Sequence, residues 1–415
     1  MIVIQEPYIS TSKTGVRLCA DIKYKMGSEV FYFEVPEEYG EYLCSEVSDA
    51  FLIGILNYAV AKGEDISVDG FISERLLYQL QTYFIPTLSV VRNKSYHTIN
   101  INARPYSGHI ENAGAVGASA SGGVDSYYTI VRHLNNVSGR YMLTHLLIAN
   151  QFNYYKSEKE TRKKFHQLIE NSKGISENYG LKLIPMYTNH NEFLFDGFVQ
   201  EYSLRICSYV FALQKLFSTY YVSSGVPYKE FDFNNHDSDG FDIFNLSLMT
   251  TDNLSFYSSG GEITRTQKIL YFADDEYIQR NLKVCNKDVD HNCSECEKCM
   301  RTMLSLDIIG KLDKFKRSFD INKFKKYQMQ YLITVESKTI EASKDLIESI
   351  EHYNYSVPFL AKVVGKSFKR FTWYMKEQVK RVEIFRKIYF LLKLDFFIYG
   401  KRQATIYRYG TEHEL

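Results

Sequence analysis

Residues 118–126 have the sequence ASASGGVDS, the most informative part of the chain for its fold class. It follows a run of small and apolar residues, expected as a buried strand over 116–120, and precedes a helical pattern over 127–134. Glycines let a backbone approach an anion closely, serine hydroxyls donate hydrogen bonds, and a helix start presents free N–H groups. The stretch therefore predicts a phosphate-binding loop, with a helix-capping turn as the alternative.

The residues around this loop alternate between short apolar runs and longer helical patterns. We expect strands over 144–149, 183–186 and 221–224, and helices over 156–178 and 201–220. This alternation is typical of a parallel sheet in an α/β protein. The loop lacks the Gly-Lys-Ser/Thr ending of a Walker loop, and Asp125 suits a residue that holds Mg²⁺ on bound phosphates.

The sequence SGGVDS at residues 121–126 resembles the signature of the PP-loop ATP pyrophosphatases. That family cleaves ATP between its α and β phosphates and transfers AMP to an acceptor oxygen. The resemblance implies a parallel-sheet domain of the adenine nucleotide alpha hydrolase-like type, with ATP and Mg²⁺ as cofactors. Residues 260–269, GGEITRTQKI, are similar to the family's downstream element, whose basic side chains suit a site where pyrophosphate is released.

The resemblance also implies a set of site residues. The expected catalytic residues are Ser121, Asp125, Ser126, Arg265 and Lys268. The expected nucleotide-binding residues are Ser119, Ser121, Gly122, Gly123, Val124, Asp125, Ser126, Ala149 and Gly225. The loop would hold the departing pyrophosphate with Mg²⁺, and the two basic residues would neutralise it. The alternative for these basic residues is a solvated helix face, since they are three positions apart.

Four of the seven cysteines lie within fifteen residues, which is a metal-site pattern. Cys285, Cys293, Cys296 and Cys299 have the spacing C-x7-C-x2-C-x2-C. We expect them to hold a structural Zn²⁺ in a closed tetrahedral site, with His291 as a bystander. An iron–sulfur cluster is the alternative. Folding is expected to depend on the metal, because the loop that carries Cys285 has little else to fix it.

Together, the loop, the 260–269 element and the cysteine cluster resemble the 7-cyano-7-deazaguanine synthase branch of the family, which contains zinc. The synthase activates a ring carboxylate with ATP and converts it, with ammonia, through an amide to a nitrile. The resemblance covers about 113–312. The chain departs from the branch at 236–242, HDSDGFD, where the synthase has a Tyr-Ser-Gly-Tyr-Pro-Asp-Cys-Arg character; Gly240, an aromatic residue and Asp242 remain, whereas Pro, Cys and Arg are absent.

The resemblance implies an ATP-dependent ligase. It would activate a small-molecule or protein carboxylate as an adenylate, with release of AMP and PPi, for attack by ammonia or an amine. One alternative is a thiolating, RNA-base-modifying enzyme, in which Cys207 would carry sulfur unless it packs in a core. The other is a non-catalytic ATP-binding component of a bacterial defence or polysaccharide gene system. An acidic loop suits Mg²⁺, an amine or solvent, and it contains Asp232, Asp237, Asp239 and Asp242.

Patterns along the chain predict three parts: an α+β N-terminal domain over 1–112, the PP-loop domain with its four-cysteine zinc motif over 113–312, and a basic helical region over 313–415. The chain as a whole has a net charge of +1, whereas residues 311–415 contain 22 basic and 12 acidic residues. This basic region could bind nucleic acid or pack on the acidic remainder, and we favour packing.

Composition and the amino-terminal sequence set the expected location. With 45% hydrophobic and 24% charged residues, the chain is not mainly disordered. The start, MIVIQEPYIS, has neither a basic leader nor a cleavage site, and the uncharged apolar run 51–61 is about half of the ~20 residues that a membrane span needs. We expect a cytoplasmic protein without a membrane segment, with a second copy of the chain as a candidate partner.

Overall fold

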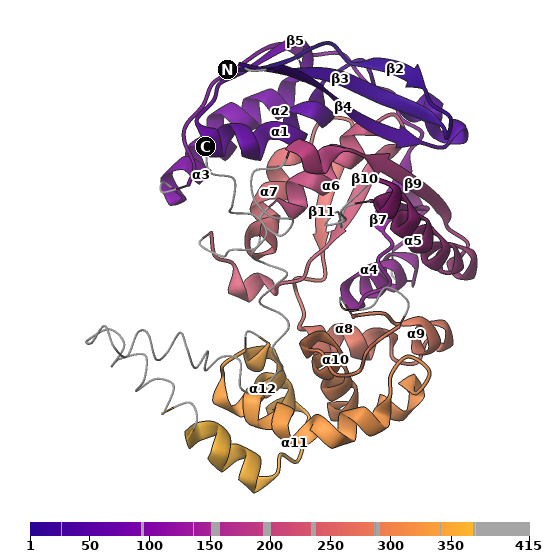
Figure 1. Cartoon of the computed structure of the whole chain (residues 1–415), viewed down its shortest axis with the longest axis vertical. Coiled ribbons are helices and arrows are strands. Elements are labelled where there is room, and N and C mark those ends of the chain that lie inside the picture. The colour runs from indigo at the N-terminus through magenta and orange to yellow at the C-terminus, as the bar shows by residue number, and fades with distance from the viewer. Residues whose placement is uncertain are drawn as a thin grey trace. The chain divides into compact units, whose positions relative to one another are not determined.

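The chain forms two compact units in the computed structural model. The first comprises Met1–Ser121 and Asp125–Ile263, and the second comprises Gly122–Val124 and Thr264–Leu415 (Figure 1). The structure describes residues 1–25, 27–92, 95–135, 137–150, 158–193, 201–233, 238–285, 287, 291–340, 342–367 and 370.

An 11-stranded sheet forms the framework of the first unit, with the strand order β11-β10-β7-β8-β9-β4-β3-β1-β5-β6 and β2 paired to β3. The strands are β1 (Ile2–Ile4), β2 (Tyr8–Thr11), β3 (Val16–Tyr24), β4 (Gly27–Val35), β5 (Ile66–Ser73), β6 (Ile101–Tyr106), β7 (Ala115–Ser119), β8 (His145–Ala149), β9 (Lys182–Thr188), β10 (Phe217–Ser223) and β11 (Ser255–Ser259). The strands from β11 to β9 are mutually parallel, as the sequence pattern predicts.

Helices alternate with the parallel strands, so the expectation of an α/β protein is confirmed. The helices of this unit are α1 (Asp49–Lys62), α2 (Glu74–Gln79), α3 (Ile85–Val91), α4 (Val124–Asn135), α5 (Glu158–Tyr179), α6 (Tyr202–Ala212) and α7 (Asp242–Met249). Every residue of β8 is buried, as in strands covered on both faces, and α5 packs against β8 and β9. The expected helix over 201–220 was too long: it ends at Ala212, and Phe217 already starts β10, whose burial against β7 overrides the local helical pattern.

The strand order reverses beside β7. The chain passes from β7 through α4 to β8 and then to β9 on one side, and returns to β10 and β11 on the other side of β7. Loops that leave the carboxyl ends of β7 and β10 therefore run in opposite directions. In open α/β sheets this divergence produces the crevice in which ligands bind.

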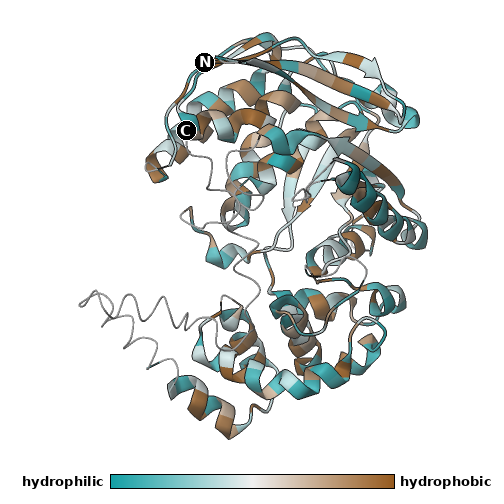
Figure 2. Ribbon diagram, in the orientation of Figure 1, coloured by the Kyte–Doolittle hydropathy of each residue, from teal (hydrophilic) through white to brown (hydrophobic). Residues whose placement is uncertain are grey.

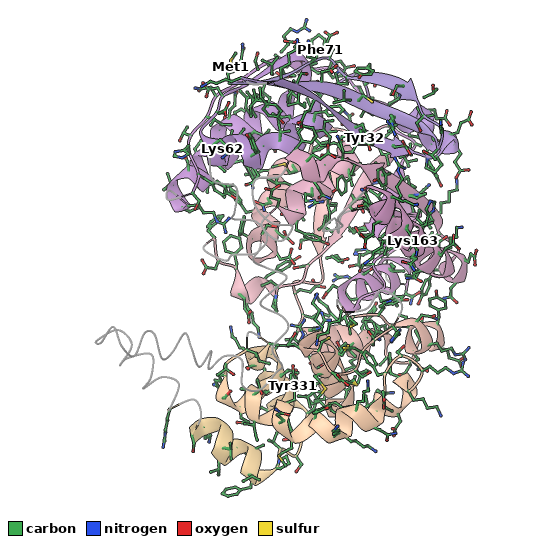
Figure 3. All side chains as sticks on the ribbon, viewed as in Figure 1. Met1, Tyr32, Lys62, Phe71, Lys163 and Tyr331 are labelled. Atoms are coloured by element: carbon green, nitrogen blue, oxygen red, sulfur yellow. The ribbon has the colours of Figure 1, made fainter. Side chains whose placement is uncertain are left out.

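The first 112 residues contribute strands and helices to the same unit. Strand β4 pairs antiparallel with β9, with Phe33 opposite Thr188. Phe33 packs on Phe51 of α1 and on Tyr209 of α6, with ring centroids 5.4 and 6.2 Å away. Side chains fill the space between the strands and the helices (Figure 3). The expected boundary at 112/113 thus falls inside a shared sheet and a shared hydrophobic core.

The second unit is helical in the part that the structure describes. Its elements are α8 (Arg265–Phe272), α9 (Glu276–Asn281), α10 (Glu297–Ile308), α11 (Ile321–Ser337), α12 (Ser343–His352), a short 3-10 segment (Leu312–Phe315) and helical residues 359–367. Helix α10 packs against α8, α11 and α12. Figure 2 shows hydrophilic and hydrophobic residues mixed along these helices. The expected boundary at 312/313 falls within this unit.

The basic region is amphipathic where it is described. On α11, Phe324, Tyr331, Leu332 and Val335 are buried, at the spacing of one helix face, whereas Lys323 and Lys325 are exposed. This helix therefore packs within its own unit, against α10 and α12. Residues 371–415, which complete the basic region, lie outside the described residues. Among the described helices, none is long and apolar enough to cross a membrane.

Candidate functional site

The predicted phosphate loop leaves the carboxyl end of β7 and enters α4, as expected from its sequence. Gly122 has a φ angle of 71°, a left-handed conformation that favours glycine. The Ser126 hydroxyl donates to the Ser119 carbonyl oxygen at 2.8 Å and accepts from the Ser121 N–H at 3.2 Å. The turn is therefore held in shape by its own residues.

The members of the loop differ in accessibility. Ser126 is only 3% exposed and closes the loop, and the Ser119 hydroxyl lies 3.1 Å from the Tyr220 hydroxyl. Ser121 is exposed, and Asp125 is half-buried. Ser119 and Ser126 therefore shape the loop, whereas Ser121 and Asp125 are its more accessible members.

The expected nucleotide-binding residues outside the loop lie at the same edge of the sheet. Ala149 is the last residue of β8, and Gly225 follows the end of β10. Both strands are direct neighbours of β7, which ends at Ser119. The tertiary structure thus brings together three chain segments that are up to a hundred residues apart in sequence.

A network that the sequence did not reveal anchors the Gly-Gly-Glu element to α4. The Tyr128 hydroxyl donates to Glu262 at 2.9 Å, Arg132 forms an ion pair with the same carboxylate, and Glu262 accepts from the Gly260 N–H at 3.2 Å. A Cβ atom on Gly261 would lie only 2.0 Å from the Tyr228 ring, which explains this glycine. The element is therefore fixed against the helix that follows the phosphate loop.

Helix α8 carries Arg265 and Lys268 in the second unit. Thr264 and Gln267 form a capping box, in which each side chain accepts from the other's backbone N–H. Lys268 is only 2% exposed, so it does not belong to a solvated helix face, and Arg265 is half-buried. The alternative reading of these residues as a solvated face therefore fails for Lys268.

Asp345 of α12 lies beside the start of α8, which sequence patterns gave no reason to expect. Burial raises the pKa of its carboxyl, while a hydrogen bond to Thr264 and the charges of Arg265 and Arg301 partly offset the increase. Through this carboxyl, the basic C-terminal region contributes to the environment of Arg265.

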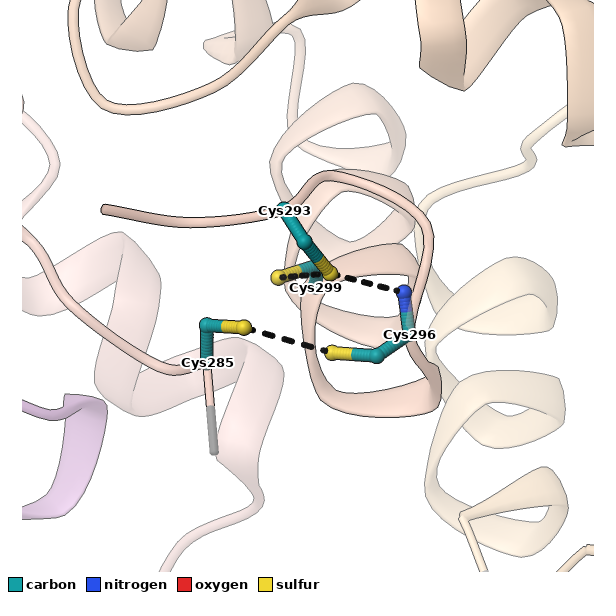
Figure 4. A group of neighbouring side chains, drawn as sticks. All are labelled: Cys285, Cys293, Cys296 and Cys299. Atoms are coloured by element: carbon teal, nitrogen blue, oxygen red, sulfur yellow. Dashed lines mark hydrogen bonds between the residues drawn. The ribbon is translucent and has the colours of Figure 1, made fainter. Parts of the chain in front are cut away.

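The four cysteines converge as their spacing predicts (Figure 4). Their sulfur atoms all lie within 4.8 Å of one another, with 4.0 Å between Cys293 and Cys299 and between Cys285 and Cys296. These separations are far longer than the ~2.05 Å of a disulfide and suit four ligands around one ion. Cys296 caps α10 and Cys299 lies in its first turn, so the helix presents two ligands. This group can hold a metal ion and is consistent with zinc, and His291 is not part of it.

Asn292 holds the segment that carries Cys285, contrary to our expectation that little but metal would fix it. Its side-chain oxygen accepts from the Val284 and Cys285 N–H groups at 2.9 and 3.1 Å. Its amide nitrogen donates to the carbonyl oxygens of Leu282 and Ser318 at 2.8 and 2.9 Å. One side chain thus accepts two hydrogen bonds and donates two, and together they fix the segment that carries Cys285.

The acidic loop is not a uniformly solvated surface. Asp232 is exposed, whereas Asp242 is 1% exposed at the start of α7, and Asp237 lies outside the described residues. Neither carboxylate oxygen of Asp242 has a partner at hydrogen-bond geometry among the described residues. The sequence indicated these acids but could not distinguish buried Asp242 from half-buried Asp239 and exposed Asp232.

Cys207 is buried in the interior of the first unit. It is 0% exposed on α6, and burial raises the pKa of its thiol well above the ordinary value. A sulfur-carrying nucleophile needs an accessible thiolate, so these properties fit core packing.

Comparisons of the chain with protein-family models, with curated proteins and with solved structures found no match.

Proposed function

We propose that this chain is an ATP-dependent adenylating enzyme of the PP-loop type, similar to the 7-cyano-7-deazaguanine synthase branch. It would activate a small-molecule or protein carboxylate as an adenylate, release PPi, and let ammonia or an amine displace AMP. The observation that carries the proposal is the position of the SGGVDS loop, at the carboxyl end of β7 where the strand order reverses. This is where α/β sheets bind ligands, and the start of α4 provides N–H groups for phosphate.

In this proposal, the chemistry of each residue sets its role. Ser121 and the backbone of Gly122, Gly123 and Val124 bind phosphate oxygens, and Asp125 binds Mg²⁺. When bound, ATP supplies the adenylyl group and the pyrophosphate that leaves. Arg265 and Lys268 offset the pyrophosphate charge, and Ala149 and Gly225 leave room for the nucleotide beside the loop.

The metal has a structural role in this proposal. Four thiolates complete the tetrahedron of Zn²⁺ and leave no position for a reacting water. The proposed zinc therefore stabilises the segment around α10 and takes no part in the chemical step.

The RNA-thiolating alternative lacks support from the described residues, because the thiol that it would use, Cys207, is buried. A non-catalytic ATP-binding component remains the other alternative. Analysis of the products distinguishes it from the proposed enzyme, because only the enzyme would form AMP.

The test is to incubate the protein with α-labelled ATP, Mg²⁺ and a small-molecule cell extract and to separate AMP from ADP. We expect AMP and PPi. Asp125→Ala should abolish AMP formation while the melting temperature stays nearly unchanged, because a half-buried loop carboxylate contributes little to packing. Asp252→Ala is the matched control, since its side chain is 75% exposed.

ADP as the only product would contradict the proposal. If Asp125→Ala instead prevented folding, the motif would be a structural turn. ATP binding without any turnover would favour the non-catalytic alternative.

A further inference from the structure

The helix over residues 359–367, drawn in yellow in Figure 1, packs on α11 through its small residues. Ala361 is 0% exposed, and Gly365, four positions later, lies on the same side of the helix and is also buried. A Cβ atom on Gly365 would lie only 2.5 Å from the Cβ atom of Glu336 and 3.0 Å from the Ile333 carbonyl oxygen, both in α11. One side of this element, which we call the 359–367 helix, is therefore fixed against its own unit.

Large apolar side chains occupy the opposite side of the 359–367 helix and are exposed. The exposed fractions are 82% for Phe359, 60% for Leu360, 44% for Val363 and 38% for Val364. Phe359 has the highest exposed fraction of the large apolar side chains among the described residues. The four residues form two adjacent rows, each with members four positions apart: Phe359 with Val363, and Leu360 with Val364. This apolar face is therefore continuous, unlike the single apolar residues that are normal on a protein surface.

A row of exposed cations runs beside the apolar face. It consists of Lys362, Lys366 and Arg370, each four positions from the next. Lys362 lies three positions after Phe359, so the two side chains are neighbours on the helix surface. The charged groups stand on long apolar stems and can therefore reach anions at the same surface that the apolar side chains meet.

The charge of this row selects among the surfaces that could cover the apolar face. The same face of a second copy would present the same cations. Residues 371–415, which follow the helix and lie outside the described residues, contain nine basic and five acidic residues. Both would meet the row with charge of like sign, which is repelled. The complementary surface is therefore apolar and anionic.

The apolar face also projects from the protein. A side chain that is 82% exposed, as Phe359 is, does not line a groove. A partner helix needs a groove of matching shape, whereas a lipid surface has no fixed shape to match. Its acyl boundary accepts projecting apolar side chains, and its anionic headgroups attract Lys and Arg. An anionic lipid surface thus fits the helix better than an acidic protein does.

We propose that the 359–367 helix docks on an anionic lipid surface. Phe359, Leu360 and Val363 enter the boundary between headgroups and acyl chains, and Lys362 and Lys366 contact the headgroup phosphates. The helix lies in the plane of the interface, with its Ala361 side still packed on α11. This docking is independent of the proposed enzymatic activity.

The test is flotation of the full-length protein with phosphatidylcholine vesicles that contain about 30% phosphatidylserine, compared with phosphatidylcholine alone. We expect binding to the anionic vesicles to be about ten-fold stronger than to the neutral ones, and to weaken as added salt screens the charges. Trp373, the single tryptophan of the chain, lies three residues after Arg370. Its fluorescence emission should shift to shorter wavelength on binding, because tryptophan side chains partition into the lipid interface.

Two double variants test the face and the row separately. Phe359→Ser with Leu360→Ser, and Lys362→Gln with Lys366→Gln, should each weaken vesicle binding about ten-fold. Because all four side chains are exposed, neither double variant should change the melting temperature.

Matched controls change side chains of the same kinds in the first unit. Val90→Ser removes a 73% exposed apolar side chain of α3, and Lys23→Gln with Lys25→Gln removes two exposed cations. Both should bind vesicles as the unchanged protein does.

Several outcomes would overturn the proposal. They are no binding to anionic vesicles, equal binding to neutral vesicles, and unchanged binding of both double variants. A dimer in solution that Phe359→Ser with Leu360→Ser dissociates would show that a second copy covers the apolar face. A lower melting temperature of the same variant would show that the chain itself covers it, and either result would also reject the lipid surface.

Discussion

Ser126 holds the phosphate loop closed with one hydroxyl group, which donates to Ser119 and accepts from Ser121. The same residue type in the same motif could equally have faced a ligand. Its burial to 3% exposure and its two backbone partners decide between the two roles. The contrast with exposed Ser121 shows how neighbouring serines of one motif divide into a structural and a ligand-facing residue.

Ser126→Ala should therefore weaken both stability and nucleotide binding. It leaves the Ser119 carbonyl and the Ser121 N–H without their partner, which costs about 2 kcal/mol of unfolding free energy. Urea unfolding and the binding of a fluorescent ATP analogue measure the two effects. Ser247→Ala, which removes an exposed hydroxyl bonded to its own helix, should change stability by less than ~0.5 kcal/mol. Equal effects of both variants would show that Ser126 does not close the loop.

Asp49 connects three elements of the first unit. It starts α1, accepts from the backbone N–H and the hydroxyl of Ser73 at the end of β5 at 2.9 and 2.5 Å, and accepts from Gln214, after α6, at 3.3 Å. The carboxyl is fully buried, and desolvation raises its pKa to about 6. Its hydrogen bonds thus join the N-terminal part of the chain to the helix that precedes β10.

Because the pKa of Asp49 is raised in the folded protein, its contribution to the free energy of unfolding changes with pH in a definite direction. Below about pH 4, the pKa of Asp49 in the unfolded chain, the protonated carboxyl contributes fully to stability. As the pH rises through the folded pKa of about 6, this contribution is lost, and the free energy of unfolding falls by about 3 kcal/mol. Buried His133, His145 and His190, with pKa values lowered by burial to about 4, 4 and 3, act oppositely and lose stability as the pH falls below about 6.5. Urea unfolding from pH 4.5 to 7.5 should therefore show the unchanged protein losing its advantage over Asp49→Asn as the pH rises. A difference that does not vary with pH would contradict the shifted pKa.

The cysteine site joins the segment after α9 to the start of α10. Asn292 takes part in four hydrogen bonds around the Cys285 segment, so protein contacts as well as any bound metal hold this part of the cysteine group. The helices of the second unit also pack on α10 through apolar residues.

Zinc removal should consequently loosen the second unit without unfolding it. We expect one Zn²⁺ per chain, no visible absorption, and a chelator-induced fall in melting temperature while the far-ultraviolet helical signal is mostly retained. Cys285→Ser should bind the metal less tightly, and Asn292→Ala should do so with all four thiolates present. Stoichiometric iron with visible absorption would reject zinc, and loss of all helical signal on chelation would show that the metal is needed for folding.

The first 112 residues and the nucleotide-site strands form a continuous sheet, joined where β4 pairs with β9. Removing the N-terminal part would expose the edge of β9 and the core rings of α6, such as Tyr209. An exposed strand edge and an uncovered apolar face both favour aggregation.

A chain that begins at residue 113 should therefore be insoluble or unfolded, whereas the full chain should unfold residues 1–263 in a single transition. Expression, light scattering and thermal melting of the two chains make the comparison. A soluble, cooperatively folded 113–415 fragment would show that the N-terminal part is a separable domain.

Features that depend on local spacing could be predicted from the order of the amino acids alone. The strand, glycine loop and helix around residues 118–126 and the convergence of four cysteines all follow from backbone geometry over a few residues. Such features can be predicted because the residues that interact are close in the chain.

How distant residues come to share one environment could be seen only in the folded chain. Several features depend on segments that are tens to hundreds of residues apart in the chain. They are the pairing of β4 with β9, the burial of Lys268 and of Asp242, and the Glu262 network on α4. The sequence around a charged residue does not show whether its side chain will be solvated or buried. Burial and partners are set by the packing of the whole sheet and its helices, because desolvation depends on every segment that surrounds a side chain.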